Sequence, residues 1–281
     1  MAGPRIGFMQ GRLSPPVEGK IQAFPWAHWR DEFALAPAAG FGLMEWTLDA
    51  ERLYQNPLMT QAGRREIAGL QARHGVAIGS LTGDFFMHAP FHKAAGEERE
   101  RRLRDLRAVC EACAALGIRT LVIPLVDAGR IETAEQEADT LRTLAALAPE
   151  LDRLGLCMAF ESDFAPRRLA RFIANLGPQF GINYDIGNSA SLGFDPAEEV
   201  NAYGARIRNV HVKDRVRGGT TVPLGTGDAD FPAVFSALSR ARYGGHYILQ
   251  TARAAGGGHR AVLERYRDMT ERWIGEARRA A

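Results

Sequence analysis

The chain has 281 residues, of which 46% are hydrophobic, and its 35 basic and 33 acidic residues give a formal net charge of +2. A charge so close to balance gives no support for a nucleic-acid partner or a membrane-surface partner. The segment Met1–Gln10 lacks the apolar run of a signal peptide, and no stretch is long enough to span a membrane. We therefore expect a cytoplasmic protein that buries one large core.

Eight short apolar segments recur along the chain, each followed by a longer amphipathic stretch. The intervals are long enough for a strand and a crossover helix, which is the repeat of a parallel sheet. Leu106, Cys110 and Cys113 follow helical spacing, so we expect both cysteines to pack in a core rather than to form a redox pair or bind zinc. The predicted strands begin near Arg5, Phe41, Val76, Arg119, Leu156, Phe180, Arg206 and His246.

Glycines precede most of these strands and are expected to end the helices before them in the left-handed conformation. Eight such units without a break in composition predict one closed (β/α)8 TIM barrel that spans residues 1–281 as a single domain. An open doubly wound sheet is the alternative, but the count of eight and the absence of Gly-x-Gly-x-x-Gly after the first strand disfavour it. The glycines are Gly40, Gly75, Gly117, Gly155 and the pair Gly244–Gly245.

Three side chains with metal-binding groups follow apolar segments at the ends of different predicted strands: Glu161, Asp185 and His211. The reactive groups of a TIM barrel lie at the carboxyl ends of its strands, so these three are expected to converge. Two carboxylates and one imidazole suit Mn²⁺, Mg²⁺ or Co²⁺, whereas zinc with a single histidine is disfavoured. Strand alternation adds that Asn183 and Lys213 face the same interior as Asp185 and His211.

The polar residues at these strand ends stand in four short motifs: Phe160–Asp163, Asn183–Asn188, Val210–Asp214 and Leu224–Asp228. Together the motifs resemble the sugar phosphate isomerase/epimerase family of xylose-isomerase-like TIM barrels, which includes ketose 3-epimerases, inosose dehydratases and relatives of endonuclease IV. The resemblance implies metal ligation by Glu161, Asp185 and His211, with a fourth ligand from the last strand. It also implies a metal-dependent isomerase or epimerase that acts on a sugar, sugar phosphate or related polyol ketone through an enediolate.

The fourth ligand position departs from the family pattern, because the ketose epimerases and isomerases have a glutamate where this chain has Gln250. An amide oxygen can ligate a hard cation but cannot act as a base. We expect Glu161 both to ligate the metal and to remove a proton, with Lys213 as the second catalytic residue. A reaction with one base, either a 1,2-isomerisation or the dehydration of an inosose or keto-sugar, stays open. The other candidates for the second role are Glu45, Asp84 and His88.

Polar residues near the remaining strand ends are expected to bind the substrate. The glycine-rich segment 218–227, together with nearby arginines, forms a candidate anion site, although solvated arginines on a surface turn would give the same pattern. The segment from Asp84 to His88 is rich in phenylalanine and is interpreted as a lid. The expected substrate-binding residues are Gln10, Glu45, Asp84, His88, Asn188, Arg215, Arg217 and Arg253.

Two other classes of protein remain as alternatives. A nuclease related to endonuclease IV would need several histidines around a cluster of metal ions and a basic face, and this sequence offers few histidines near strand ends. A non-catalytic sugar-binding barrel fits if Gln250 marks the loss of catalysis. A small carbohydrate is therefore the expected partner, and the resemblance leaves a homo-oligomer open.

Overall fold

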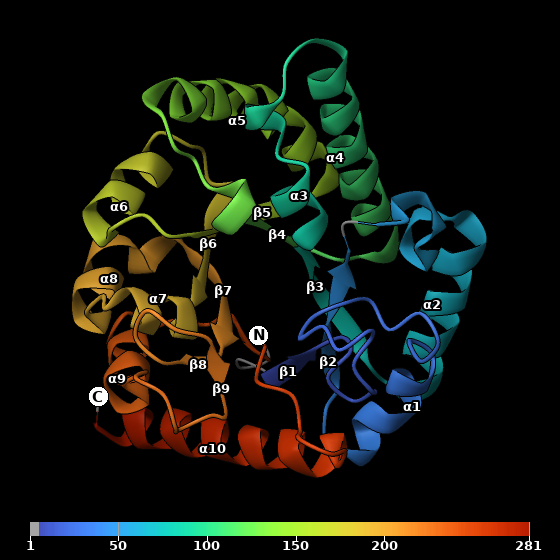
Figure 1. Cartoon of the computed structure of the whole chain (residues 1–281), viewed down its shortest axis with the longest axis vertical. Coiled ribbons are helices and arrows are strands. Elements are labelled where there is room, and N and C mark those ends of the chain that lie inside the picture. The colour runs from blue at the N-terminus through green and yellow to red at the C-terminus, as the bar shows by residue number, and fades with distance from the viewer. Residues whose placement is uncertain (1–5, 50, 281) are drawn as a thin grey trace.

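Eight parallel strands close into a barrel, and the helices that connect them form a ring around it (Figure 1). The computed structural model describes residues 6–49 and 51–280. The strands follow the order β1-β10-β7-β6-β5-β4-β3-β2, so the last strand of the barrel pairs with the first. This arrangement confirms the predicted (β/α)8 barrel and excludes the open sheet.

Each of the eight predicted apolar segments forms one strand of the barrel. A small antiparallel hairpin, β8 (Asp214–Arg215) with β9 (Thr221–Val222), lies outside the barrel in the glycine-rich segment after β7. The hairpin was not predicted, because its two-residue strands are too short to give a periodic pattern. The barrel strands are β1 (Ile6–Met9), β2 (Leu43–Leu48), β3 (Ala77–Gly83), β4 (Thr120–Leu125), β5 (Cys157–Ser162), β6 (Phe180–Asp185), β7 (Ile207–Val212) and β10 (His246–Leu249).

The α-helices vary from one turn to six. Within the described ranges, no helix combines the length and the apolar composition needed to cross a membrane. Cys110 and Cys113 are buried in α4, as predicted. The helices are α1 (Asp31–Ala38), α2 (Gln61–His74), α3 (Asp84–His88), α4 (Gly96–Leu116), α5 (Ala134–Leu154), α6 (Pro166–Ala174), α7 (Ile186–Leu192), α8 (Pro196–Tyr203), α9 (Phe231–Arg240) and α10 (His259–Ala280).

Most of the predicted helix ends use glycine, since a residue without a side chain adopts the left-handed conformation without strain. Two of the predicted positions differ. Ala39 caps α1 one residue before Gly40, and Ala241 caps α9 in a right-handed conformation before the pair Gly244–Gly245. The prediction was wrong at the pair because the turn before β10 is longer than a single cap. The glycines that cap α2, α4 and α5 with positive φ are Gly75, Gly117 and Gly155.

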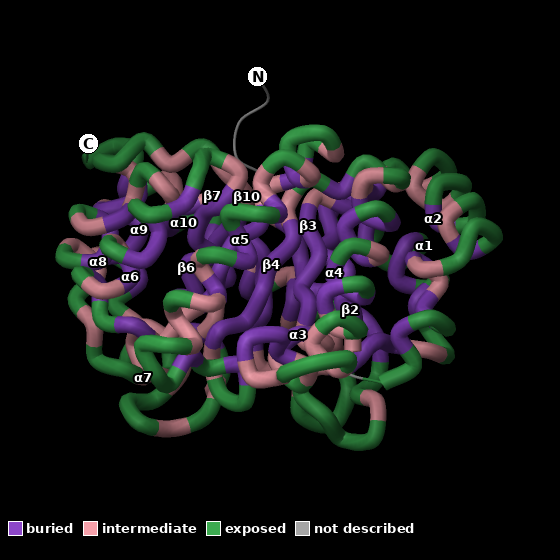
Figure 2. The backbone as a smooth tube through the Cα atoms, turned by 90° about the horizontal axis from the view of Figure 1, so that it is seen from above, coloured by how far each residue is buried: buried purple, intermediate pink, exposed green. Residues whose placement is uncertain are grey.

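Most of the hydrophobic core lies between the strands and the helices, where Phe8 and Trp46 are fully buried. Seen from the side, buried segments run through the middle of the molecule, and α3 and α7 lie at the edge where the strands end (Figure 2). The interior of the barrel holds a separate small apolar layer of Met9, Leu43 and Ile248. Above this layer the inward side chains are polar. The interior of the barrel is therefore polar at the carboxyl ends of the strands.

A buried carboxylate holds the loop that follows β1. Glu32 on α1 is 0% exposed, and it accepts hydrogen bonds from the backbone N–H of Gly11 at 2.7 Å and of Leu13 at 2.9 Å. The hydroxyl of Ser14 donates a third bond at 3.1 Å. Because this loop carries Arg12 to the mouth of the barrel, Glu32 fixes one side of the open end from below.

We expect Glu32 to make the stability of the fold depend on pH. Burial raises the pKa of Glu32 from 4.5 to about 7, against the opposing effect of its three donors. Between these values the folded protein keeps a proton that the unfolded chain has lost, so the contribution to stability falls as the pH rises and is constant above about pH 7. The loss is on the order of 3 kcal/mol.

Urea unfolding of the wild type and of the Glu32→Gln variant from pH 4.5 to pH 8 tests this expectation. The variant cannot ionise at this position, so the difference in unfolding free energy between the two proteins should shrink as the pH rises. Parallel stability curves would show that Glu32 is already ionised in the folded protein across the whole range.

Candidate metal centre

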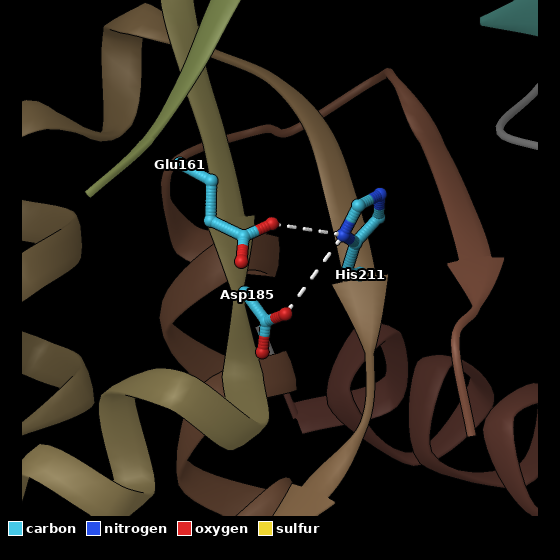
Figure 3. Close-up of side chains that lie close together, drawn as sticks. All are labelled: Glu161, Asp185 and His211. Atoms are coloured by element: carbon cyan, nitrogen blue, oxygen red, sulfur yellow. Dashed lines mark ion pairs between the residues drawn. The ribbon is translucent and has the colours of Figure 1, made fainter. Parts of the chain in front are cut away.

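Glu161, Asp185 and His211 converge at the carboxyl ends of β5, β6 and β7, as predicted. Nδ1 of His211 lies 3.2 Å from Oε2 of Glu161 and 3.8 Å from Oδ2 of Asp185. Both carboxylates point at this one nitrogen atom (Figure 3). The ligand atoms of the three residues all lie within 4.8 Å of one another, and all three residues are buried. Neighbouring ligand atoms around one divalent ion lie roughly 3 to 4 Å apart, so the spacing suits such an ion.

The second nitrogen of His211 fixes the orientation of the ring. Nε2 donates to Oε1 of Glu45 at 2.7 Å, and Nδ1 lies 3.0 Å from Nδ2 of Asn183. A histidine that donates one N–H to a carboxylate presents the lone pair of its other nitrogen, which is the usual arrangement of a metal-bound imidazole. Burial opposes protonation of His211, but Glu45, Asp185 and Glu161 raise its pKa well above the ordinary value. The cluster therefore attracts positive charge strongly.

Glu45 was expected to contact the substrate, and the structure places it below His211 with an exposure of 0%. Its oxygens accept hydrogen bonds from Ser80 and Thr82, both at 2.5 Å, and from Asn209 at 2.8 Å. Burial opposes ionisation, but the charge of His211 and these donors outweigh it and lower the pKa of Glu45. In this position Glu45 orients His211.

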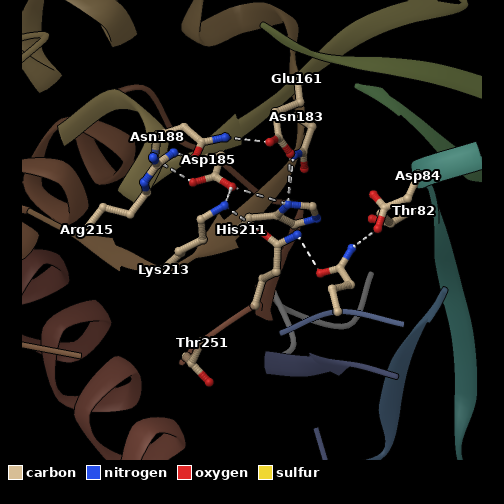
Figure 4. A network of polar contacts seen from close by, with 12 residues as sticks. Thr82, Asp84, Glu161, Asn183, Asp185, Asn188, His211, Lys213, Arg215 and Thr251 are labelled. Atoms are coloured by element: carbon tan, nitrogen blue, oxygen red, sulfur yellow. Dashed lines mark hydrogen bonds and ion pairs between the residues drawn. The ribbon is translucent and has the colours of Figure 1, made fainter. Parts of the chain in front are cut away.

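Lys213 lies beside the metal centre and contacts two of the predicted ligands. Its Nζ donates to Oδ2 of Asp185 at 2.8 Å (Figure 4). It also donates to Oε1 of Gln250 at 3.1 Å. Gly187 makes room for this side chain, because a Cβ atom there would lie 2.7 Å from Cγ of Lys213. The carbonyl oxygen of Gln250, predicted as the fourth ligand, thus accepts a hydrogen bond from an ammonium group. The Asp185 carboxylate has a lowered pKa, because Lys213 and His211 outweigh its burial.

Asn188 connects Glu161 to the hairpin after β7. Its amide donates to Oε1 of Glu161 at 2.6 Å, and its own oxygen accepts from Nη1 of Arg215 at 2.7 Å. Arg215 also donates to the carbonyl oxygen of Gly219. Asn188 and Arg215 were expected to bind the substrate, and in this structure they hold one oxygen of Glu161 while the other faces the cluster.

The three arginines predicted to hold an anion do not gather at one place. Arg217 is exposed and lies against Gly193, whereas Arg253 donates to the carbonyl oxygens of Gly11 and Ser14 in the loop after β1. The glycine-rich segment itself is held by Asp214, which accepts backbone hydrogen bonds along it. Segment 218–227 is therefore organised around a carboxylate of the protein.

A cavity of about 450 Å³ opens between the loops that follow β1, β2 and β3. Gln22, Asp84 and His88 line it together with Lys20 and Arg52. The predicted lid segment forms the short helix α3 at its edge. Burial raises the pKa of Asp84 to about 6, and the negative charge of Glu161 adds to the effect.

Gln22 joins the cavity to the metal centre. It donates to Asp84 at 2.5 Å, and its oxygen accepts from Nε2 of Gln250 at 3.0 Å. Gln10, predicted as a substrate-binding residue, is instead fully buried and accepts from the backbone N–H of Thr47. Sequence reasoning missed Gln22, because a residue within a long loop has no periodicity to place it.

The inward neighbours of Glu45 were also missed. Ser80, Thr82 and Asn209 stand inside strand segments, where a polar residue on the inner face is a signal that could have been used. Ser80 and Thr82 alternate along β3, and Asn209 precedes His211 by two residues on β7. Such spacing places all three on the inner side of the barrel with the metal centre.

The donor set of the centre suits one hard divalent ion. Among the residues that the structure describes, Glu161, Asp185 and His211 form the one group of three or more such side chains close enough to share an ion. It contains a single histidine, which argues against the nuclease alternative with its several histidine ligands. Two carboxylate oxygens and one imidazole favour magnesium, manganese or cobalt.

Comparisons with known proteins agree with this geometry. The L-ribulose-5-phosphate 3-epimerase UlaE of Escherichia coli is 25% identical over 237 residues, which cover 79% of this chain and 81% of that protein. The solved structure of an L-ribulose 3-epimerase has a TM-score of 0.76 at 18% identity and covers 99% of this chain and 96% of its own.

A xylose isomerase-like TIM barrel protein from Mycobacterium smegmatis, solved in complex with magnesium, has a TM-score of 0.71 at 16% identity and covers 98% of both chains. At these identities the solved structures establish the fold alone. The sequence model of one family matches residues 33–271. Since the match spans most of the chain, this protein belongs to the xylose isomerase-like TIM barrel family.

Proposed function

We propose that this chain is a divalent-metal-dependent isomerase or epimerase that acts on a sugar, a sugar phosphate or a related polyol ketone. The observation that carries the proposal is the convergence of Glu161, Asp185 and His211 beside a cavity at the mouth of the barrel. The names of the relatives, which include an L-ribulose-5-phosphate 3-epimerase, support the same reaction class. Manganese as the native ion and a cytoplasmic location are parts of this proposal.

The proposed metal ligands are Glu161, Asp185 and His211, with Gln250 as a fourth if Lys213 releases its amide oxygen. A divalent ion in this place would stabilise the negative charge that develops on a substrate oxygen when a neighbouring carbon loses its proton. Glu45 keeps the His211 ring in the ligating orientation, and Asn188 keeps one oxygen of Glu161 turned away from the ion.

Glu161 is the proposed base. Its carboxylate lies at the cluster, where a chelated substrate would present the carbon next to its carbonyl group. A positioned carboxylate can take the proton from that carbon and leave an enediolate. Asn188 donates to Oε1, whereas Oε2 lies toward the cluster and accepts from Asn183, which supports separate roles for the two oxygens in the proposed reaction.

Lys213 is the proposed second acid–base group, in place of the missing glutamate. Its ammonium is held between Asp185 and the neutral amide of Gln250, and it can return a proton to the enediolate. Glu161 and Lys213 come from β5 and from the end of β7, on either side of β6, so they approach the substrate from different directions. The proposed substrate contacts are Gln22, Asp84 and His88, which line the cavity.

Elimination of water is the second candidate reaction, and Gln250 is the observation that favours it. A dehydration needs one base and one acid, which Glu161 and Lys213 supply without a second carboxylate. Carbon NMR of the products from ketoses, ketose phosphates and inososes with Mn²⁺ present separates the two reactions, because only the elimination removes a hydroxyl group from the carbon skeleton.

We expect Glu161→Gln to reduce turnover by at least about a hundredfold while the protein stays folded. The amide cannot take a proton, but it keeps the size of the side chain and one ligating oxygen. Exchange of the substrate proton with deuterated solvent, read by NMR, measures the base directly. Retained exchange in a folded variant would rule out Glu161 as the base.

We expect Gln250→Glu to keep the fold, to bind Mn²⁺ at least as tightly as the wild type and to change the ratio of products. The substitution adds a negative charge next to Lys213 and places a carboxylate where the family resemblance implies one. Product ratios by NMR and the melting temperature give the two readouts. Loss of the fold would show that Gln250 has a structural role.

We expect Glu45→Gln to lower the affinity for Mn²⁺ by roughly tenfold to a hundredfold. The amide removes the charge that supports His211 and turns an N–H₂ group toward the donors around it. Competition with a fluorescent chelator measures the affinity. Glu199→Gln is the matched control, because Glu199 is a buried carboxylate that accepts from Tyr184, Ser189 and Tyr203 away from the cluster. Equal affinities in both variants would show that Glu45 does not orient the ligand.

A further inference from the structure

Two guanidinium groups meet at the mouth of the barrel without a carboxylate in contact. Arg12 follows β1 and Arg253 follows β10, and these strands are neighbours in the closed sheet. Arg12 is 4% exposed, and it donates from Nε to the carbonyl oxygen of Thr251 at 2.9 Å. Arg253 donates from Nη1 to the carbonyl oxygens of Gly11 and Ser14.

Three nitrogen atoms of this pair are buried and have no hydrogen-bond partner among the described residues: Nη1 of Arg12, and Nε and Nη2 of Arg253. Burial and the charge of Arg253 lower the pKa of Arg12 to about 9. Glu32 acts on the charge of both guanidinium groups and Asp84 on that of Arg12, but neither contacts them. The oxygens of Glu32 accept from the backbone of the β1 loop, and Asp84 accepts from Gln22. A buried cation with open donors is costly unless an anion completes it.

The side of Arg12 that faces the active site carries only a weak contact. Nη2 donates to Oε1 of Gln22 at 3.3 Å, and Gln22 lines the cavity and contacts Gln250. An amide oxygen therefore stands where an oxygen of an anion would sit. The side chain of Gln22 is half-buried. If it rotated away, Nη1 and Nη2 of Arg12 would be presented together, as the fork that binds phosphate or carboxylate in a bidentate manner.

We propose that Arg12 and Arg253 form the receptor for an anionic group of the substrate, a phosphate monoester or a carboxylate at the end of the sugar away from the metal centre. The inference rests on the proposed function and narrows its substrate class to anionic sugars. It places the anion between the loops after β1 and β10, and not at Arg215 or Arg217 beyond β7. In the absence of the anion, Gln22 accepts the hydrogen bond from Nη2 of Arg12.

Isothermal titration calorimetry with the full chain tests the receptor independently of turnover. The ligands are L-ribulose, L-ribulose 5-phosphate, D-glucuronate and inorganic phosphate. We expect wild-type protein to bind at least one of the anionic sugars more tightly than L-ribulose. Whether L-ribulose 5-phosphate or D-glucuronate binds more tightly shows whether the receptor prefers a phosphate or a carboxylate. Arg12→Gln and Arg253→Gln should each weaken that binding roughly tenfold to a hundredfold, because each removes charged hydrogen bonds. Binding of L-ribulose should not change.

Arg206→Gln is the matched control. Arg206 also donates to backbone carbonyls, at Leu176, Gly177 and Phe180, and also has an open Nε, but it lies at the opposite end of the barrel. The Arg206→Gln variant should bind the neutral sugar and the anionic sugars as tightly as the wild type does. Arg12→Lys keeps the positive charge but loses the two-pronged guanidinium group, and the retained charge lowers the risk of misfolding. We expect its affinity for the anionic sugar to lie between those of the wild type and Arg12→Gln.

Equal wild-type affinity for L-ribulose and for both anionic sugars would overturn the receptor, as would an equal loss for the neutral and the anionic ligands in the Arg12 and Arg253 variants. These results would leave an isomerase of neutral sugars standing. Conversely, selective loss of anion binding in a protein that converts no ketose would support the receptor and remove the proposed function.

Discussion

The hydrogen bond between His211 and Glu45 is the interaction on which the candidate metal centre depends. It joins β7 to β2 across the interior of the barrel, and both side chains have an exposure of 0%. Without the carboxylate, the buried imidazole would lose the partner that fixes its tautomer and its orientation. Without the imidazole, the carboxylate would be a buried charge held only by neutral donors. Each residue therefore explains why the other can be buried.

The interior of the barrel is built in layers that separate packing from chemistry. Met9, Leu43 and Ile248 form the apolar layer, the network around Glu45 lies above it, and the metal centre lies above both. Gln250 makes the top layer less negative than a carboxylate in its place would, because it contributes a neutral amide. Lys213 is held by that amide, and the centre remains attractive to cations with fewer negative groups.

The fold and the metal trio were predictable, because both follow from regular structure. Strand alternation and the rule that reactive groups lie at strand ends were enough to bring Glu161, Asp185 and His211 together. The task of Glu45 was not predictable from one strand, since it depends on a partner across the barrel. Gln22 lies in a loop, where spacing along the chain does not give the direction of a side chain. Arg253 was singled out from the sequence, but its contacts with the loop after β1 were not predictable for the same reason.

Closure of the barrel by β1 and β10 has a consequence for how the protein matures. The bond from Arg12 to Thr251 spans 239 positions along the chain, and the bond from His211 to Glu45 spans 166. Contacts of such separation form late, because the intervening chain must first be made and ordered. A nascent chain that has emerged as far as β7 already contains the metal trio but not Gln250 or Arg253. The mouth of the barrel is therefore completed only after β10 and the loop that follows it have been synthesised.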